Sequence, residues 1–258
     1  MSKGRDETTT RGWRRSFHTT HWTEILDAKS EDEPRRHEAL RELLGRYWKP
    51  VYCYLRCKGC DREDAKDLTQ GFFHEVVLGR DLIQRADRDK GRFRTFLLTA
   101  LDRYATDVHR AEKAKQRMPE GGLVPLEGVD GLNVPESFHY TTPVEVFDYA
   151  WASALLDQVL AEVAEECHER SKTAYWEVFQ ARVLRPIMEH AESPSLGHLC
   201  EKYSIPSNAK ASKMSIAVKR RFRAILRRHV RQLVESDAQV NDEIRYLMRV
   251  FFRDSGRS

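Results

Sequence analysis

Apolar residues recur every three to four positions along most of this chain, which is the spacing of one buried face on an α-helix. In the first half, the pattern predicts three helices: over residues 35–58, from an N-cap at Asp61 onward, and from about Phe93. Pro50 lies inside the first, and we expect it to bend or break that helix, because proline lacks the N–H of the helical hydrogen bond. The first half is therefore predicted to be a helical block.

Eight prolines and glycines fall from Met118 to Pro143, a density that neither a helix nor a long strand tolerates. We interpret this segment as a flexible linker. Helical spacing returns beyond it, over residues 144–167 and 174–188. The chain is thus predicted to hold two helical blocks.

The second block ends in a short helix, a turn and a long helix. Ser195 opens the short helix, which runs to Tyr203; residues 204–210 form the turn, and the long helix begins near Ala211. This order is typical of a helix-turn-helix, whose second helix enters the major groove of DNA. A last amphipathic helix is expected in residues 237–258, packed on the second domain.

These patterns predict an all-α protein with two helical domains joined by a flexible linker, the C-terminal one being a helix-turn-helix. The first domain covers residues 31–117, the linker 118–143 and the second domain 144–236. Residues 1–30 are an N-terminal extension, and residues 237–258 are a C-terminal amphipathic tail.

The composition of the 258 residues argues against a membrane protein. Charged residues make up 33% of the chain, and no segment approaches the roughly 20 apolar residues that a membrane-spanning helix needs. The N-terminus carries charges where a signal peptide needs an apolar run, so we expect a cytoplasmic protein. Its five cysteines are then expected to be reduced thiols or metal ligands rather than disulfides.

The net charge of +4 conceals a strong segregation of charge along the chain. Residues 118–170 hold eleven acids and one base, whereas residues 193–231 hold ten bases and one acid. A weaker excess, ten bases against five acids, lies over residues 85–117. A basic block on a predicted helix-turn-helix indicates binding to a polyanion, and nucleic acid is favoured over a merely solvated face.

Several sequence runs resemble the extracytoplasmic-function class of bacterial RNA polymerase sigma factors, and among them a divergent group found in planctomycetes. The runs are FHTTHW at residues 17–22, RYWKP at 46–50, DAKDLTQGFF at 64–73, KGRFRTFLL at 90–98 and VKRRF at 218–222. The resemblance extends from Phe17 to about Phe252. It implies a factor that binds core RNA polymerase and directs it to specific promoter DNA. An anti-sigma protein is a common further partner in this family.

The resemblance also implies three sets of site residues. The core-polymerase set lies on the predicted second helix: Asp64, Asp67, Leu68, Gln70 and Phe72. The promoter-melting set combines aromatic residues for unpaired bases with cations for phosphates: Arg92, Phe93, Arg94, Phe96, Arg103, Tyr104, Asp107, Arg110 and Lys113. In the DNA-binding helix, the first four residues would contact bases and the others phosphates: Lys210, Ser212, Lys213, Ser215, Lys219, Arg220, Arg221 and Arg223.

Two of these sets have an alternative interpretation. The aromatic residues of the melting segment fit the core of a helical bundle as well as a base-stacking surface. For Leu68 and Phe72, periodicity does not separate core from interface. The sequence also departs from the family, which often has Trp at the position of Phe96 and Asn at that of Arg103.

Two other functions compete with the sigma-factor hypothesis. A stand-alone helix-turn-helix regulator would bind DNA without core polymerase. Cys53, Cys57 and Cys60 have the CxxxCxxC spacing with which radical S-adenosylmethionine enzymes bind an iron–sulfur cluster, but those enzymes place it on a loop of an α/β barrel. The sequence has no phosphate-binding loop, no dinucleotide fingerprint, no HExxH and no nucleophile elbow, so we expect no catalysis, no cofactor and no resident metal.

Overall fold

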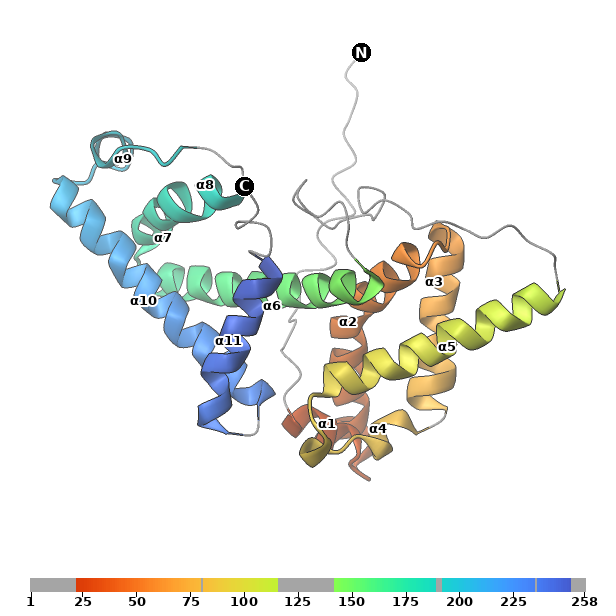
Figure 1. The fold of residues 1–258 in the computed structure, drawn as a ribbon. Helices are drawn as coiled ribbons and strands as arrows, with labels where there is room; N and C mark the ends of the chain where they lie inside the picture. The colour runs from red at the N-terminus through yellow and green to blue at the C-terminus, as the bar shows by residue number, and fades with distance from the viewer. Residues whose placement is uncertain (1–21, 80, 116–141, 189–191, 235, 252–258) are drawn as a thin grey trace, which may run out of the picture. The chain divides into compact units, whose positions relative to one another are not determined.

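The computed structural model describes residues 22–79, 81–115, 142–188, 192–234 and 236–251, and every regular element in these ranges is a helix (Figure 1). Helix-to-helix contacts divide the chain into two compact units, residues 1–155 with 249–258, and residues 156–248. The boundary between them falls inside one helix, between Leu155 and Leu156. The predicted linker lies outside the described residues except for its last two positions, of which Pro143 begins a helix.

Among its described residues, the first unit contains five α-helices and the first part of a sixth. They are α1 (Trp22–Ala28), α2 (Glu33–Cys57), α3 (Arg62–Gly71), α4 (Leu82–Arg85), α5 (Phe93–Lys115) and the beginning of α6 (Pro143–Glu169). A π-helical segment (Phe72–Leu78) continues α3, and a 3₁₀ turn (Arg88–Lys90) precedes α5. Asp61 caps α3 as predicted, because its carboxylate accepts a hydrogen bond of 2.8 Å from the backbone N–H of Asp64. The short helices α1 and α4 were not predicted.

Helix α2 runs without interruption through Pro50, so the prediction of a break there is wrong. Proline removes one backbone hydrogen bond and crowds the preceding turn, a cost of about 3 kcal/mol in an exposed helix. Every residue from Pro50 to Cys57 is buried, so this stretch of α2 is enclosed by packing on all sides. We attribute the continuity of the helix to that burial, which outweighs the loss of one hydrogen bond.

Aromatic side chains form much of the core of the first unit. The Tyr47 ring meets the edge of Phe93 at a centroid distance of 5.6 Å and stacks on Phe147 of α6 at 6.3 Å. Phe72, which is fully buried, packs against Tyr104 at 5.6 Å. These contacts join α2, α5, α6 and the π-helical segment around one apolar interior.

The second unit contains the rest of α6, then α7 (Thr173–Phe179), α8 (Arg185–Met188), α9 (Leu196–Lys202), α10 (Asn208–Leu233) and most of α11 (Asp237–Phe251). A π-helical segment (Gln180–Leu184) connects α7 with α8. Ser195 is the N-cap of α9, as predicted. The long helix begins at Asn208, three residues before the predicted start, because the Ser207 hydroxyl caps it by accepting from the Lys210 backbone N–H at 3.2 Å.

Among the described residues, no helix combines the length and the apolar character that crossing a bilayer requires.

Candidate nucleic-acid interface

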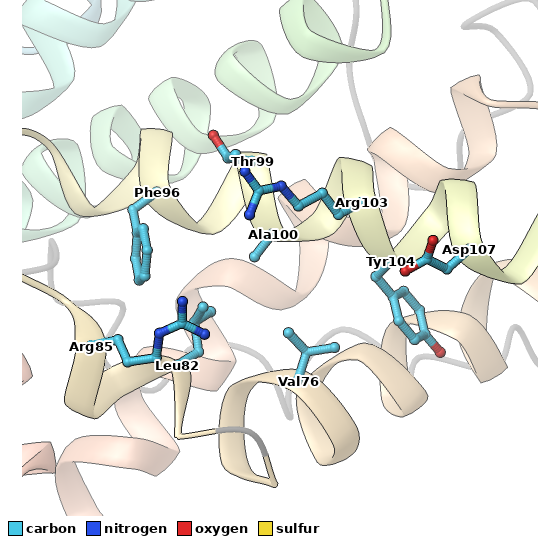
Figure 2. Close-up of a pocket in the computed structure, with 9 residues that line it drawn as sticks. All are labelled: Val76, Leu82, Arg85, Phe96, Thr99, Ala100, Arg103, Tyr104 and Asp107. Atoms are coloured by element: carbon cyan, nitrogen blue, oxygen red, sulfur yellow. The ribbon is translucent and has the colours of Figure 1, made fainter.

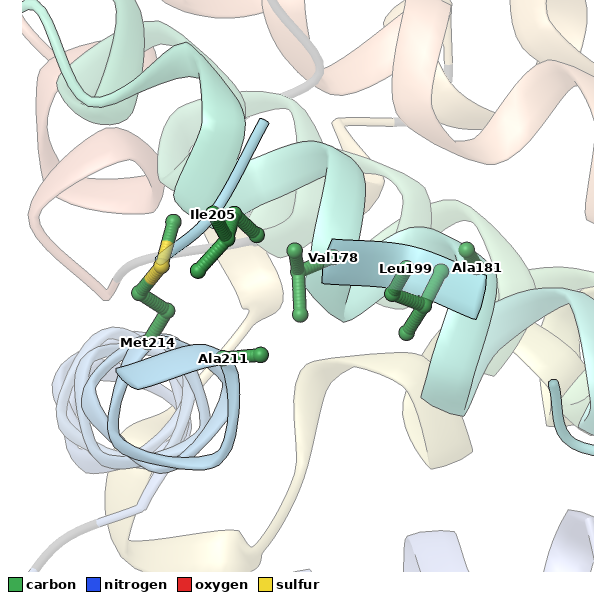
Figure 3. Close-up of a cluster of buried hydrophobic side chains, with 6 residues drawn as sticks. All are labelled: Val178, Ala181, Leu199, Ile205, Ala211 and Met214. Atoms are coloured by element: carbon green, nitrogen blue, oxygen red, sulfur yellow. The ribbon is translucent and has the colours of Figure 1, made fainter. Parts of the chain in front are cut away.

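A small apolar cluster holds α9, the following turn and the beginning of α10 together. Its buried members come from α7, the π-helical segment, α9, the turn and α10: Val178, Ala181, Leu199, Ile205, Ala211 and Met214. Figure 3 shows these side chains directed toward a shared interior, with Ile205 supplied by the turn. The cluster therefore fixes the start of α10 relative to the short helix before it.

The turn between α9 and α10 depends on one residue in a left-handed conformation. Ser204 has φ = 52°, a value that glycine adopts most easily. The next residue, Ile205, points back into the apolar cluster, and its N–H donates to the Cys200 carbonyl at 2.9 Å. Five residues, 203–207, thus separate the end of α9 from the start of α10 at Asn208.

The side chains of α10 divide into a buried stripe and an exposed basic row. The stripe runs at helical spacing and packs mainly on α7 and α9: Ala211, Met214, Ser215, Val218 and Ile225. Five cations lie on the exposed side, and we call them the basic row: Lys210, Lys213, Lys219, Arg220 and Arg223. Ser212 is half-buried, and Ser215 is only 5% exposed, so the structure removes Ser215 from the residues predicted to contact bases.

A second set of cations on α10 is engaged by acidic side chains. Arg221 forms a bidentate ion pair with Glu166 of α6. Glu162, one turn earlier on α6, pairs with Arg228 and lies 2.9 Å from Nε2 of the buried His229. Within the ranges that the structure describes, no ion pair involves any member of the basic row.

The predicted role of Arg221 therefore changes. It was expected to contact phosphate, but its guanidinium is held by Glu166 inside the second unit. Hydrogen bonds from Arg221 hold the pKa of Glu166 below its usual value, more strongly than partial burial raises it. Burial opposes ionisation of Glu162, yet the hydrogen bonds from Arg228 and His229 outweigh it and lower that pKa as well.

The first unit has a cleft of about 140 Å³ between α5 and the short helix α4. Apolar side chains and the Tyr104 ring line its interior, while two arginines, a threonine and a carboxylate stand at its edges: Val76, Leu82, Phe96, Ala100, Tyr104, Arg85, Arg103, Thr99 and Asp107. Figure 2 shows the Phe96 ring of α5 pointing toward Arg85 and Leu82, while the Arg103 side chain extends along α5 toward Thr99. An apolar interior with cations at its rim suits a flat, uncharged group attached to an anion.

The structure divides the predicted melting set between the cleft and the core. Phe96, Arg103, Tyr104 and Asp107 line the cleft, although Tyr104 is largely buried. Arg110 is exposed elsewhere along α5, Arg92 is half-buried, and the Lys113 side chain lies outside the described residues.

Phe93 and Arg94 belong to the core instead. Phe93 packs on Tyr47, and the buried Arg94 guanidinium lies 3.7 Å from Asp148 and 4.3 Å from the centre of the Trp151 ring. Phe93 is only 5% exposed and Arg94 only 6%, so neither belongs to a surface that could contact unpaired DNA. Of the two interpretations of the aromatic residues, core packing rather than base stacking therefore applies to Phe93 and in part to Tyr104.

The predicted core-polymerase set is divided in the same way. Phe72 is fully buried beneath α5, so it serves the core rather than an interface. Leu68 is half-buried, whereas Asp64, Asp67 and Gln70 are exposed on α3. The members of this set that α3 exposes are therefore polar, two of them acidic, on a helix that also exposes the cations Arg62 and Lys66.

The cysteines of the CxxxCxxC run do not form a loop. Cys53 and Cys57 are buried on the continuous helix α2, and Cys60 follows its end. Burial raises the pKa of Cys53 to about 12 and also raises that of Cys57, so both favour the neutral thiol over the thiolate that binds metals. No group of three or more metal-binding side chains occurs among the residues that the structure describes.

Some residues of both surfaces were not anticipated. Arg85 and Thr99 at the cleft were outside the predicted set, as was Ile216 beside the basic row. The part of the cleft that α5 supplies could have been predicted from spacing. Its residues recur at intervals of three to four and therefore share one face of the helix: Phe96, Ala100, Arg103 and Asp107. The part that α4 supplies could not have been predicted in this way, because a helix of four residues is too short to show a periodic pattern.

Comparison with known proteins identifies no relative. No protein-family model matches the chain, and no curated protein or solved structure matches it either.

Proposed function

We propose that this protein is a sigma-type transcription initiation factor, which binds core RNA polymerase in the cytoplasm and directs it to specific promoters. The observation that carries the proposal is the basic row on α10, five exposed cations held above a packed helix, turn and helix. The sequence runs at residues 64–73 and 90–98 supply the assignment to sigma factors rather than to DNA-binding proteins in general. The proposal includes two helical domains, the second a helix-turn-helix.

The basic row suits the major groove of DNA. An α-helix with its side chains is about 10–12 Å across, and the groove is about 12 Å wide. Lys210 and Lys213 lie in the first two turns of α10, where side chains reach base edges, while Lys219, Arg220 and Arg223 follow toward the phosphates. These cations make no ion pair within the described parts of the chain, so contact with phosphate would not require breaking one.

In the first unit, the cleft beside α5 suits an unpaired base of the melted promoter. The half-buried Phe96 ring offers a stacking surface, and Arg85 and Arg103 supply charges for the adjacent phosphates. Asp107 places a carboxylate at the same cleft, where it would accept a hydrogen bond from an exocyclic amine. Promoter melting needs these contacts, because a base that leaves the duplex loses its own stacking and pairing partners.

Reconstituted transcription tests the proposal. The full-length protein, mixed with purified bacterial core polymerase and a library of genomic fragments, should produce transcripts that start at a limited set of sites. Core polymerase alone gives the background. If the protein neither binds core polymerase nor changes the start sites, the proposal is wrong.

The basic row also favours a second candidate, a regulator that binds DNA by itself. This function would show as specific DNA binding by the free protein, with no effect of core polymerase on affinity. A sigma factor instead gains promoter affinity when core polymerase is added.

A further inference from the structure

One apolar side chain interrupts the exposed face that carries the basic row. Ile216 is 53% exposed on α10, and Ala217 beside it is also exposed. The buried stripe of the same helix passes through Met214 and Val218, so Ile216 does not contribute to the core. Its helical neighbours on the exposed side are cations, Lys213 at three positions before it and Lys219 and Arg220 at three and four after it.

A scattered exposed isoleucine is ordinary on a protein surface. Ile216 differs in its surroundings, because the side chains about one turn away in both directions carry positive charge. A protein partner for this face would have to be acidic and apolar at once. The major groove of DNA meets both conditions: phosphates line its edges, and the C5-methyl group of thymine is the apolar feature on its floor.

We propose that Ile216 contacts the C5-methyl group of a thymine in the major groove and thereby fixes one position of the promoter sequence. The inference rests on the proposed function, which brings α10 to promoter DNA. It adds a residue that the expected base contacts did not include and names the base that this residue recognises.

The position of Ile216 along α10 favours contact with a base over contact with the backbone. It lies eight residues into the helix, about 12 Å from its beginning, so it is flanked by Lys213 on one side and Arg220 on the other. The long Lys213 side chain can extend to a neighbouring base edge and the long Arg220 side chain to a phosphate, while the short isoleucine points between them. A methyl–methyl contact discriminates thymine from cytosine, which has hydrogen at C5.

The experiment begins with selection of preferred DNA sites from a random library by the complete protein with core polymerase. Each thymine of the selected site is then replaced by deoxyuridine, which removes the C5-methyl group alone. For the native protein we expect one position at which deoxyuridine weakens binding roughly 3- to 10-fold. For Ile216→Ala we expect the same weakening with thymine and no further loss with deoxyuridine. Ile216→Val should give an intermediate result.

Ile187→Ala is the matched control, because Ile187 is an isoleucine of similar exposure (57%) on α8, away from the basic row. It should retain the full deoxyuridine effect.

If the native protein selects no sequence at all, the proposed function fails and this inference fails with it. If a sequence is selected but deoxyuridine is neutral at every position, or Ile216→Ala keeps the native sensitivity, the inference alone is overturned. Loss of core-polymerase binding in Ile216→Ala with unchanged methyl sensitivity would assign the residue to a protein contact, which also overturns it.

Discussion

Two glycines in long helices have opposite roles. At Gly71 of α3, a Cβ atom would lie 2.5 Å from the Tyr104 hydroxyl oxygen, and that ring is largely buried against Phe72. At Gly45 of α2, a Cβ atom would have no neighbour within 4 Å. Gly71 therefore leaves room for the Tyr104 side chain of α5 at the end of α3, whereas Gly45 is replaceable.

We expect Gly71→Ala to lower the free energy of unfolding by about 1–3 kcal/mol. The alanine gains about 1 kcal/mol in helix propensity, but the displaced Tyr104 ring disrupts a packed core at greater cost. Gly45→Ala gains the propensity alone and should raise stability by about 0.5–1 kcal/mol. Urea unfolding of both variants measures the difference. Equal effects of the same sign would contradict the assigned contact.

The buried charge of Arg94 shows what periodicity does not reveal about single residues. Along α5, the spacing of apolar residues predicts which positions are buried. It does not predict burial of an arginine, which is expected at the surface. Its burial depends on Asp148 and Trp151, which lie more than fifty residues later in the chain. That pairing depends on how α6 packs against α5, which sequence spacing alone does not specify.

At the scale of elements, the acids of α6 act as anchors for α10. The lowered pKa of Glu166 means that its ionised form stabilises the folded state. This contribution is fully present above the unfolded-state pKa of about 4.3, and it is lost as pH falls through the lower folded-state value. The pairs are partly exposed, so solvent screening keeps each contribution small.

We therefore expect Glu166→Gln to lower the free energy of unfolding by about 1 kcal/mol at neutral pH, and the deficit to disappear as pH falls below the unfolded-state pKa of about 4.3 and through the lower folded-state pKa of Glu166. Glu165→Gln is the control, because Glu165 is exposed one position earlier on α6 and forms no ion pair within the described ranges. Thermal unfolding across this pH range provides the measurement. A deficit that does not change with pH would show that the Arg221 pair is not its source.

The cations of α10 should differ in their effect on DNA binding according to whether they are paired. Lys219→Gln with Arg220→Gln removes two members of the basic row, so the slope of log affinity against log salt should decrease in magnitude by roughly 2. Arg221→Gln with Arg228→Gln removes the same charge from the same helix, but both side chains are engaged by α6. This control should retain the native slope in DNA titrations. Equal changes of slope would contradict the division of α10 into paired and unpaired cations.

At the scale of the whole molecule, the proposed assembly with core polymerase should depend on the exposed acids of α3. We expect Asp64→Lys with Asp67→Lys to weaken core binding at least 10-fold while leaving the unfolding transition unchanged, since both side chains are exposed. Glu31→Lys with Glu201→Lys makes the same change of net charge at exposed sites elsewhere. Competition with a known bacterial sigma factor for core polymerase measures both. Phe72→Ala is unsuitable for this purpose, because loss of a fully buried ring destabilises the fold by about 3–5 kcal/mol.

The sequence predicted the all-helical architecture and most helix boundaries within a few residues, because the 3.6-residue period and the caps at Asp61 and Ser195 are local signals. It was less reliable wherever tertiary packing decides. Pro50 is tolerated inside a buried helix, and Phe72 and Phe93 turned out to be core residues. To predict that Pro50 is tolerated, or that Phe72 and Phe93 are buried, one must know which elements pack over these helices. The spacing of apolar residues does not contain that information.

The residues of α10 that stabilise the fold are separate from those that protrude from it, and this separation affects how the sequence of the exposed surface can evolve. The cations that secure the helix, Arg221 and Arg228, pair with α6, while Lys213, Ile216 and Arg220 protrude without supporting the fold. Substitutions in the protruding set cost little stability, so under the proposed function a lineage would change its target promoters by a few mutations and retain the same scaffold. If α10 binds promoter DNA as proposed, the same separation gives an engineer a surface on which orthogonal promoter preferences can be installed without redesigning the core.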